Sequence, residues 1–186
     1  MSNKSISIFI EKATDKLMEE ILLAILKWFN RMGYGNPFNY NRGIEFLQAR
    51  MFGFKLTIVG GGSDGKNDEG ITAEFKYTKW IGYTKKGTLR SHPFTYNGTT
   101  RKNTLEEQEK YCREKIMRDP HHYWSLIDND TGKFVHSYKV PAETVWKLLW
   151  PKWKRSFHNP NAADPRIGAQ LTTNDLNGEE FEFILH

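Results

Sequence analysis

The sequence is poor in cysteine and contains no long apolar run. A single cysteine, Cys112, among 186 residues excludes an intramolecular disulfide and a zinc site built from several cysteines. The longest apolar stretch, residues 21–29, is interrupted by Lys27 and is far shorter than the roughly 20 residues that span a bilayer. The first residues also lack the pattern of an export signal. We therefore expect a cytoplasmic protein with no membrane segment.

Two common catalytic motifs are missing as well. The chain has no Gly-x-Ser-x-Gly motif, which carries the nucleophilic serine of many hydrolases, and Cys112 lies among charged residues with no evident base. The glycine run 60–62 is not followed by the Gly-Lys-Ser/Thr of a phosphate-binding loop. Serine, cysteine and P-loop chemistry therefore have no support in the sequence.

Aromatic and basic residues, in contrast, are abundant. Phe, Tyr and Trp make up 14% of the chain, too many for a disordered protein. The length suits one domain with its own hydrophobic core. Lys and Arg number 27 against 22 Asp and Glu, which gives a net charge of +5. This charge permits a nucleic-acid partner without requiring one.

Apolar spacing and turn residues predict a chain that mixes helices and strands. Apolar residues recur every three or four positions over 5–32, which predicts a long N-terminal helix. Further helices are expected at 44–51, 105–118 and 142–150, and Pro151 should end the last of them. Strands are expected at 54–59, 71–78, 122–127, 133–140 and 180–185. The expected fold is α/β (α+β), with a mixed central sheet flanked by helices.

The loops between these elements are also predicted. Strands 54–59 and 71–78 should pair as a hairpin across a polar turn, and residues 82–103 should form an exposed loop or ribbon.

The adjacent His121 and His122 should face opposite sides of a strand, so they cannot share one metal ion.

The second predicted strand carries a carboxylate and an ammonium on one face. Alternate side chains on a strand share a face, so Glu74 and Lys76 should project together while Phe75 points to the opposite, buried side. Asp64 lies ten residues before Glu74, and a turn would bring the two acids together. Neighbouring carboxylates repel unless a cation lies between them, and Mg²⁺ prefers carboxylate, water and phosphate oxygens. The sequence therefore predicts a Mg²⁺ site, where Lys76 could orient or help deprotonate a water.

Two alternatives remain open for these residues. A Glu-x-Lys tripeptide is common on solvated strands, and Asp64-Gly65-Lys66 is a second acid-x-Lys in the same chain. Asp68 is a rival for the first acid. We favour Asp64 because Asp68 should lie at the apex of the turn, where its side chain would face solvent.

In this context the sequence resembles the PD-(D/E)XK nucleases. Their motif places an acid before an acid-x-Lys tripeptide across a hairpin, after a helix that often carries a glutamate. The matching residues here are Asp64, Glu74, Phe75, Lys76 and Glu45. The core of the resemblance spans about residues 38–140 of a single domain, 1–186. The proline of the motif is absent, because Ser63 precedes Asp64.

This resemblance implies a fold and a chemistry. The fold would be that of restriction endonucleases, and the activity would be Mg²⁺-dependent cleavage of duplex DNA. Asp64, Glu74 and the backbone carbonyl of Phe75 would bind the metal, and Lys76 would position the attacking water. Glu45 would be an accessory carboxylate.

By size and general character, the whole chain also resembles the small catalytic subunits of heterodimeric Type IIS restriction endonucleases. That resemblance implies a larger nicking-endonuclease subunit, of the GAGTC-recognising group, that reads the DNA and cuts one strand while this chain cuts the other. From the residues alone, a self-contained homodimeric endonuclease and a non-catalytic DNA-binding or interaction subunit remain alternatives. The largely apolar C-terminal half of helix 5–32 is a candidate surface for a partner.

Cations alternate with aromatic residues immediately after the acid-x-Lys segment. Such interleaving suits contact with phosphates and bases near a cleaved bond. The candidate DNA-binding residues are Lys79, Lys85, Lys86, Arg90 and His92. An ordinary solvated basic loop is the alternative.

Overall fold

The computed structural model describes residues 14–39, 41–60, 62–97, 100–159 and 167–184. The helices are α2 (Asp15–Arg31), α3 (Arg42–Met51), α4 (Leu105–Met117), α5 (Ala142–Phe157) and a 3₁₀ turn, η1 (Thr173–Leu176). The strands are β1 (Lys55–Leu56), β2 (Gly65–Lys66), β3 (Thr72–Lys79), β4 (Pro93–Tyr96), β5 (His121–Ile127), β6 (Phe134–Pro141), β7 (Ala169–Thr172) and β8 (Glu182–Ile184). None of the helices in these ranges is long and apolar enough to cross a membrane.

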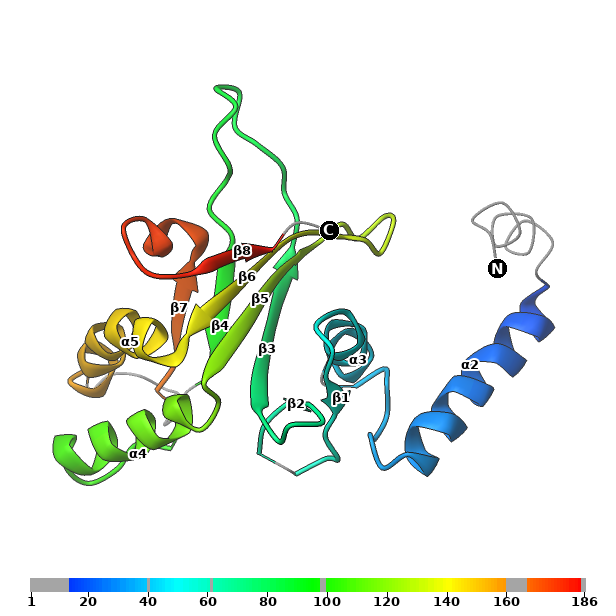
Figure 1. Cartoon of the computed structure of the whole chain (residues 1–186), viewed down its shortest axis with the longest axis horizontal. Helices are drawn as coiled ribbons and strands as arrows, with labels where there is room; N and C mark the ends of the chain where they lie inside the picture. Colours follow the sequence, from blue (N-terminus) through cyan, green and yellow to red (C-terminus); the bar gives the residue numbers. More distant parts are fainter. Residues whose placement is uncertain (1–13, 40, 61, 98–99, 160–166, 185–186) are drawn as a thin grey trace.

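Six strands form one mixed sheet in the order β1-β2-β3-β5-β6-β8 (Figure 1). β3 and β5 run parallel, and each other neighbouring pair in this sheet is antiparallel. β4 pairs with β7 in a separate two-stranded sheet. The expected mixed α+β fold is therefore confirmed. β8 also lies at the edge of the sheet, where an edge strand over 180–185 was expected, although residue 185 lies outside the described residues.

The two faces of the sheet are covered by different helices. Trp124 of β5 is fully buried and packs in a cluster with residues of α4, α5 and β4. Its neighbour Tyr123 points the other way and packs with Phe75 and Phe54 beside α3. Figure 1 shows α3 on one side of β3, with α4 and α5 together on the other. Burial of each large apolar side chain stabilises the fold by about 1.5–3 kcal/mol, so both layers hold the central strands in place.

Helix α4 begins and ends where local sequence signals predict. Thr104 and Glu107 form a capping box, in which each side chain accepts a hydrogen bond from the other residue's backbone N–H. The helix ends at Met117, and Pro120 follows before β5 begins at His121. The last turn of α4 therefore lies immediately before the strand that pairs with β3.

Helix α5 does not stop at Pro151, so the predicted end at residue 150 is wrong. An internal proline removes one backbone hydrogen bond and costs about 3 kcal/mol. The helix nevertheless continues to Phe157, because the next turn fully buries Trp153 in the main core. The rings of Trp146 and Trp150 also stack, with centroids 5.2 Å apart. Tertiary packing therefore outweighs the local stop signal.

The predicted hairpin between residues 54–59 and 71–78 is also wrong. β2 lies between β1 and β3, so these three strands form an antiparallel meander. β1 is only two residues long, because the chain then leaves the sheet and the N–H of Val59 donates to the carbonyl of Gly33.

Residues 82–103 are not one exposed loop. β4 forms within this segment and buries Phe94 and Tyr96 in the main core. Residues 80–91 do form a ribbon, closed by a bridge between Tyr83 and Leu89, and Figure 1 shows it projecting beyond the end of β3.

Helix α2 stands at the edge of the molecule (Figure 1), and most of its residues are exposed. Its end at Arg31 agrees with the predicted end of the helix over 5–32, whereas residues 5–13 lie outside the described part of the chain. Phe29 is the residue of α2 that is buried. Five large apolar side chains of α2 and that of its C-cap residue are exposed: Met18, Leu22, Leu23, Ile25, Trp28 and Met32.

Candidate active site

Asp64 immediately precedes β2, rather than lying within a strand as expected, and it lies against β3. The N–H of Asp64 donates to the carbonyl of Ala73 over 3.0 Å, and Asp64 Oδ2 accepts a hydrogen bond from the N–H of Phe75 at 2.8 Å. Asp68 lies in the following turn instead, where its exposed carboxylate pairs with Lys55. The structure therefore brings Asp64, and not Asp68, beside the Glu74–Lys76 segment.

Gly65 allows this close approach of β2 to β3. A Cβ atom at Gly65 would lie 2.7 Å from Cζ of Phe75 and 3.2 Å from Cβ of Phe54. Phe75 is buried on the α3 side, as the alternation of β3 predicted. A glycine at this position therefore lets the ring of Phe75 pack directly under the backbone that carries Asp64.

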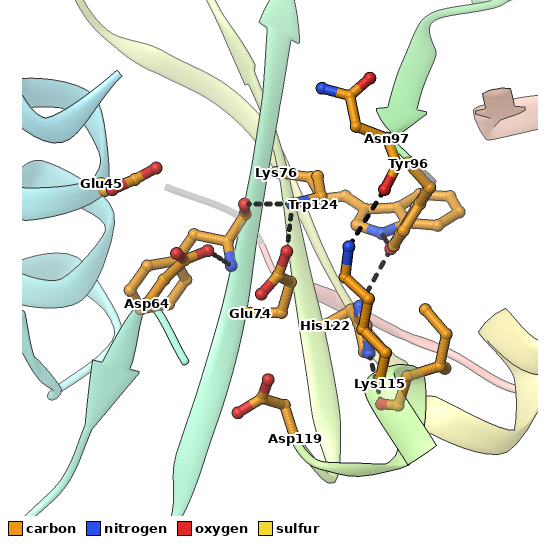
Figure 2. Close-up of polar contacts among 12 residues, drawn as sticks. Glu45, Asp64, Glu74, Lys76, Tyr96, Asn97, Lys115, Asp119, His122 and Trp124 are labelled. Atoms are coloured by element: carbon orange, nitrogen blue, oxygen red, sulfur yellow. Dashed lines mark hydrogen bonds and ion pairs between the residues drawn. The ribbon is translucent and has the colours of Figure 1, made fainter. Parts of the chain in front are cut away.

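Glu74 and Lys76 form an ion pair on the opposite face of β3 (Figure 2). Their side chains are only 17% and 21% exposed, and Lys76 Nζ also lies 3.3 Å from the carbonyl oxygen of Phe75. Burial opposes the charge on Lys76, but Glu74 and Asp64 outweigh it and raise the pKa of its ammonium. Burial likewise opposes the charge on Glu74, yet Lys76 and His122 lower the pKa of its carboxyl. Both groups are therefore charged at neutral pH.

Asp64 carries the excess negative charge of the site. Burial, and then the charge of Glu74, raise the pKa of Asp64 from 3.8 to about 7, although Lys76 acts in the opposite direction. A cation bound between Asp64 and Glu74 would relieve this repulsion. Across the described ranges, no group of three or more His, Cys, Asp or Glu side chains is arranged to hold a metal ion. Two carboxylates with the Phe75 carbonyl still suit Mg²⁺, which usually keeps several of its waters.

Glu45 faces the same cleft from α3 (Figure 2). It lines a cavity of about 570 Å³ together with Asp64 and Thr57. Its Oε2 accepts a hydrogen bond from Nη1 of Arg42 at 2.7 Å, and Arg42 is itself anchored on the carbonyls of Tyr34 and Thr57. Burial raises the pKa of Glu45, against the effect of Arg42. The helix position of Glu45 therefore agrees with the expectation, while its carboxylate is already engaged by a cation.

Several residues around Glu74 were missed by sequence reasoning. A second cavity, of about 170 Å³, is lined by Glu74 and Lys76 together with Tyr96, Lys115, Arg118 and His122. His122 pairs with Glu74 in the parallel register of β3 and β5, so an expected pairing of these strands could have identified it. Lys115 has no comparable signal, because it is one of many charges on a solvated helix.

His122 has a structural role rather than a metal-binding one. Its ring is buried, with Nδ1 3.1 Å from the hydroxyl of Tyr96 and Nε2 3.1 Å from the carbonyl of Ile116. The indole N–H of Trp124 donates to the same hydroxyl at 2.7 Å. This network of hydrogen bonds holds β4, α4 and β5 together around Glu74. His121 lies on the opposite face of β5, as expected.

The predicted DNA-binding cations occupy two places. Lys79, at the end of β3, lines a cavity of about 450 Å³ with Lys76 and Glu45. Lys85, Lys86 and Arg90 are exposed on the projecting ribbon of residues 80–91. The structure therefore does not bring the ribbon cations to Glu74.

His92 must be removed from the predicted DNA-binding set. Its side chain is fully buried, its ring stacks on Trp80, and its Nε2 accepts a hydrogen bond from the N–H of Ile81. Burial also lowers the pKa of the ring. His92 therefore anchors the base of the ribbon and is not accessible to DNA.

Comparison with known proteins adds no relative. No protein-family model matches the sequence, and no curated protein is significantly similar to it. What Asp64, Glu74 and Lys76 do is therefore inferred from their geometry.

Proposed function

We propose that this chain is a Mg²⁺-dependent DNA endonuclease of the PD-(D/E)XK type that cleaves one strand of duplex DNA. One observation carries the proposal: the half-buried Asp64, whose pKa is raised, accepts a hydrogen bond from the backbone of β3 beside the Glu74–Lys76 ion pair. Withdrawing a carboxylate from water without a cation to balance its charge destabilises the fold, which favours a functional site over an ordinary solvated strand.

The residues of the site take distinct roles in this proposal. Asp64, Glu74 and the Phe75 carbonyl would hold the metal. Bound Mg²⁺ supplies a more acidic water and neutralises charge on the phosphate. Lys76 is an ammonium at neutral pH, so it acts as a hydrogen-bond donor that positions the water and stabilises negative charge, and not as the base. Arg42 holds Glu45 at the edge of the cleft as an accessory carboxylate.

The charge distribution supports DNA as the substrate. The chain has a net charge of +5, and its exposed cations include Lys79 beside the cleft and Lys85, Lys86 and Arg90 on the ribbon. A projecting ribbon of this kind can contact phosphates at a distance from the cleaved bond. Neutralised phosphates release counterions, so binding should weaken as salt rises.

A single site cuts one strand, so a double-strand break needs a second site. The exposed apolar face of α2 supports a protein partner, because monomers rarely expose a large apolar patch. Trp28 and Ile25 of α2, with Phe38, Phe46 and Leu47, line a cavity of about 980 Å³ at this face. In this proposal the partner is the larger nicking-endonuclease subunit that the resemblance implies.

Cleavage assays with matched variants test the proposal. Glu74→Gln and Lys76→Met should lower the rate of strand cleavage at least 100-fold, with the fold and DNA binding in Ca²⁺ retained. The controls Glu69→Gln and Lys66→Met make the same charge changes at exposed positions and should cleave normally. Cleavage that survives in Glu74→Gln, or that is insensitive to a chelator, would contradict the assignment.

The same assays distinguish the alternatives. They are run on supercoiled plasmid, with and without the candidate large subunit. Salt-sensitive binding that is never accompanied by cleavage would favour a non-catalytic DNA-binding subunit. Sedimentation of the pure chain as a tight dimer at micromolar concentration would favour a self-contained homodimeric enzyme.

A further inference from the structure

The cavity of about 170 Å³ beside Glu74 has an unusual set of charges. It is lined by three cations, Lys76, Lys115 and Arg118, and by one carboxylate, Glu74. Lys115 projects into it from the last turn of α4, and Figure 2 shows Lys115 and Asp64 on opposite sides of Glu74. The proposed metal ligands and this cationic cavity therefore share Glu74 as their common wall.

Two of the three cations already have anionic partners. Lys76 is paired with Glu74, and Nε of Arg118 lies 3.5 Å from Oδ2 of the buried Asp119. The ammonium of Lys115 donates to the carbonyl of Asn97 over 3.1 Å, which is a neutral acceptor. Within the described residues, no carboxylate forms an ion pair with Lys115. Lys115 is therefore a half-buried cation whose charge is not balanced by a direct partner.

The electrostatics of Lys115 agree with a missing anion. Burial lowers the pKa of its ammonium, and Glu74 offsets only part of this effect, because Lys76 and Arg118 repel it. His122 cannot supply an anion, and both of its ring nitrogens are already engaged by Tyr96 and Ile116. A charge that is partly withdrawn from water is stabilised when a ligand of opposite charge binds it.

We infer that this cavity binds a phosphate group of the DNA backbone, and that Lys115 is the residue that contacts it. A water occupies about 30 Å³ in the liquid, so a cavity of this size accommodates a tetrahedral oxyanion. The inference rests on the proposed function, because it places a phosphate beside Glu74 and Lys76. It adds a binding residue that is remote in sequence from the acid-x-Lys motif.

Equilibrium binding to DNA tests the inference. The probe is a labelled duplex of about 20 base pairs in Ca²⁺, titrated at several salt concentrations. Lys115→Met should weaken binding about ten-fold and reduce the salt dependence by about one phosphate contact. Lys115→Arg should retain most of the affinity. Lys110→Met removes the same charge from an exposed position of α4 and should leave the affinity unchanged within about two-fold.

Thermal unfolding in inorganic phosphate gives a readout that is independent of cleavage. Without metal and at matched ionic strength, phosphate in place of chloride should stabilise the wild type and Lys110→Met more than it stabilises Lys115→Met, which keeps only the general effect of this salt. Wild-type affinity in Lys115→Met, or stabilisation by phosphate as large as that of the wild type, would overturn the inference. If the wild type never cleaves DNA while the phosphate effect depends on Lys115, the proposed function fails and the anion site remains.

Discussion

Replacement of Asp64 by asparagine is expected to stabilise the metal-free protein at pH 8. The pKa of Asp64 is raised from 3.8 to about 7. Between about pH 4 and pH 7, the carboxyl of Asp64 is therefore protonated in the folded state but ionised in the unfolded state. Stability attributable to Asp64 is therefore present in acid and is lost as pH rises from about 4 through about 7. Each unit of pKa difference corresponds to about 1.4 kcal/mol. The rise from 3.8 to about 7 therefore lowers the free energy of unfolding at alkaline pH by about 4 kcal/mol, relative to acid.

The variant should recover part of this free energy. Asparagine keeps an oxygen that can accept the N–H of Phe75 and removes the repulsion with Glu74, but its NH₂ group needs a partner in a half-buried position. We therefore expect Asp64→Asn to exceed the wild type in free energy of unfolding by about 1–3 kcal/mol at pH 8, and to match it near pH 4. Strand cleavage should be lost in the same variant.

Denaturant titrations between pH 4 and pH 8, in the presence of a chelator, measure the difference. Asp68→Asn is the matched control, because its side chain is exposed and should not alter the pH dependence. Mg²⁺ at ten times its dissociation constant should then stabilise the wild type by about 1.4 kcal/mol and the Asp64→Asn variant by less. An Asp64→Asn protein that is less stable than the wild type at pH 8, or that keeps its pH dependence, would refute the reasoning.

Two further predictions concern the support of the site and its reach toward DNA. Gly65→Ala should lower the free energy of unfolding by about 1–3 kcal/mol and reduce cleavage, because its methyl group would collide with the ring of Phe75. In a double-mutant cycle, Phe75→Leu should relieve part of that loss, and strictly additive effects would argue against the collision. The double variant Lys85→Ala/Lys86→Ala should weaken duplex binding several-fold at low salt while leaving the cleavage rate of bound DNA unchanged. A lower rate at saturating protein would place the ribbon in the catalytic site instead.

The sequence by itself determined the elements that depend on local interactions. Alternation along β3 separates Glu74 and Lys76 from Phe75, because successive side chains of a strand face opposite sides. The capping box at Thr104 fixes the start of α4 through contacts within one turn. Such features are determined by residues only a few positions apart, so their patterns are visible in the printed chain.

Tertiary packing decided the features that depend on distant segments. Burial of Trp153 carries α5 past Pro151, and stacking on Trp80 withdraws His92 from solvent. Lys115 lines the same cavity as Glu74 only because α4 connects β4 to β5 in the chain and its last turn lies beside the sheet. In each case, contacts between separate parts of the chain contribute more free energy than the local preferences do. No local pattern in the sequence could therefore have revealed these features.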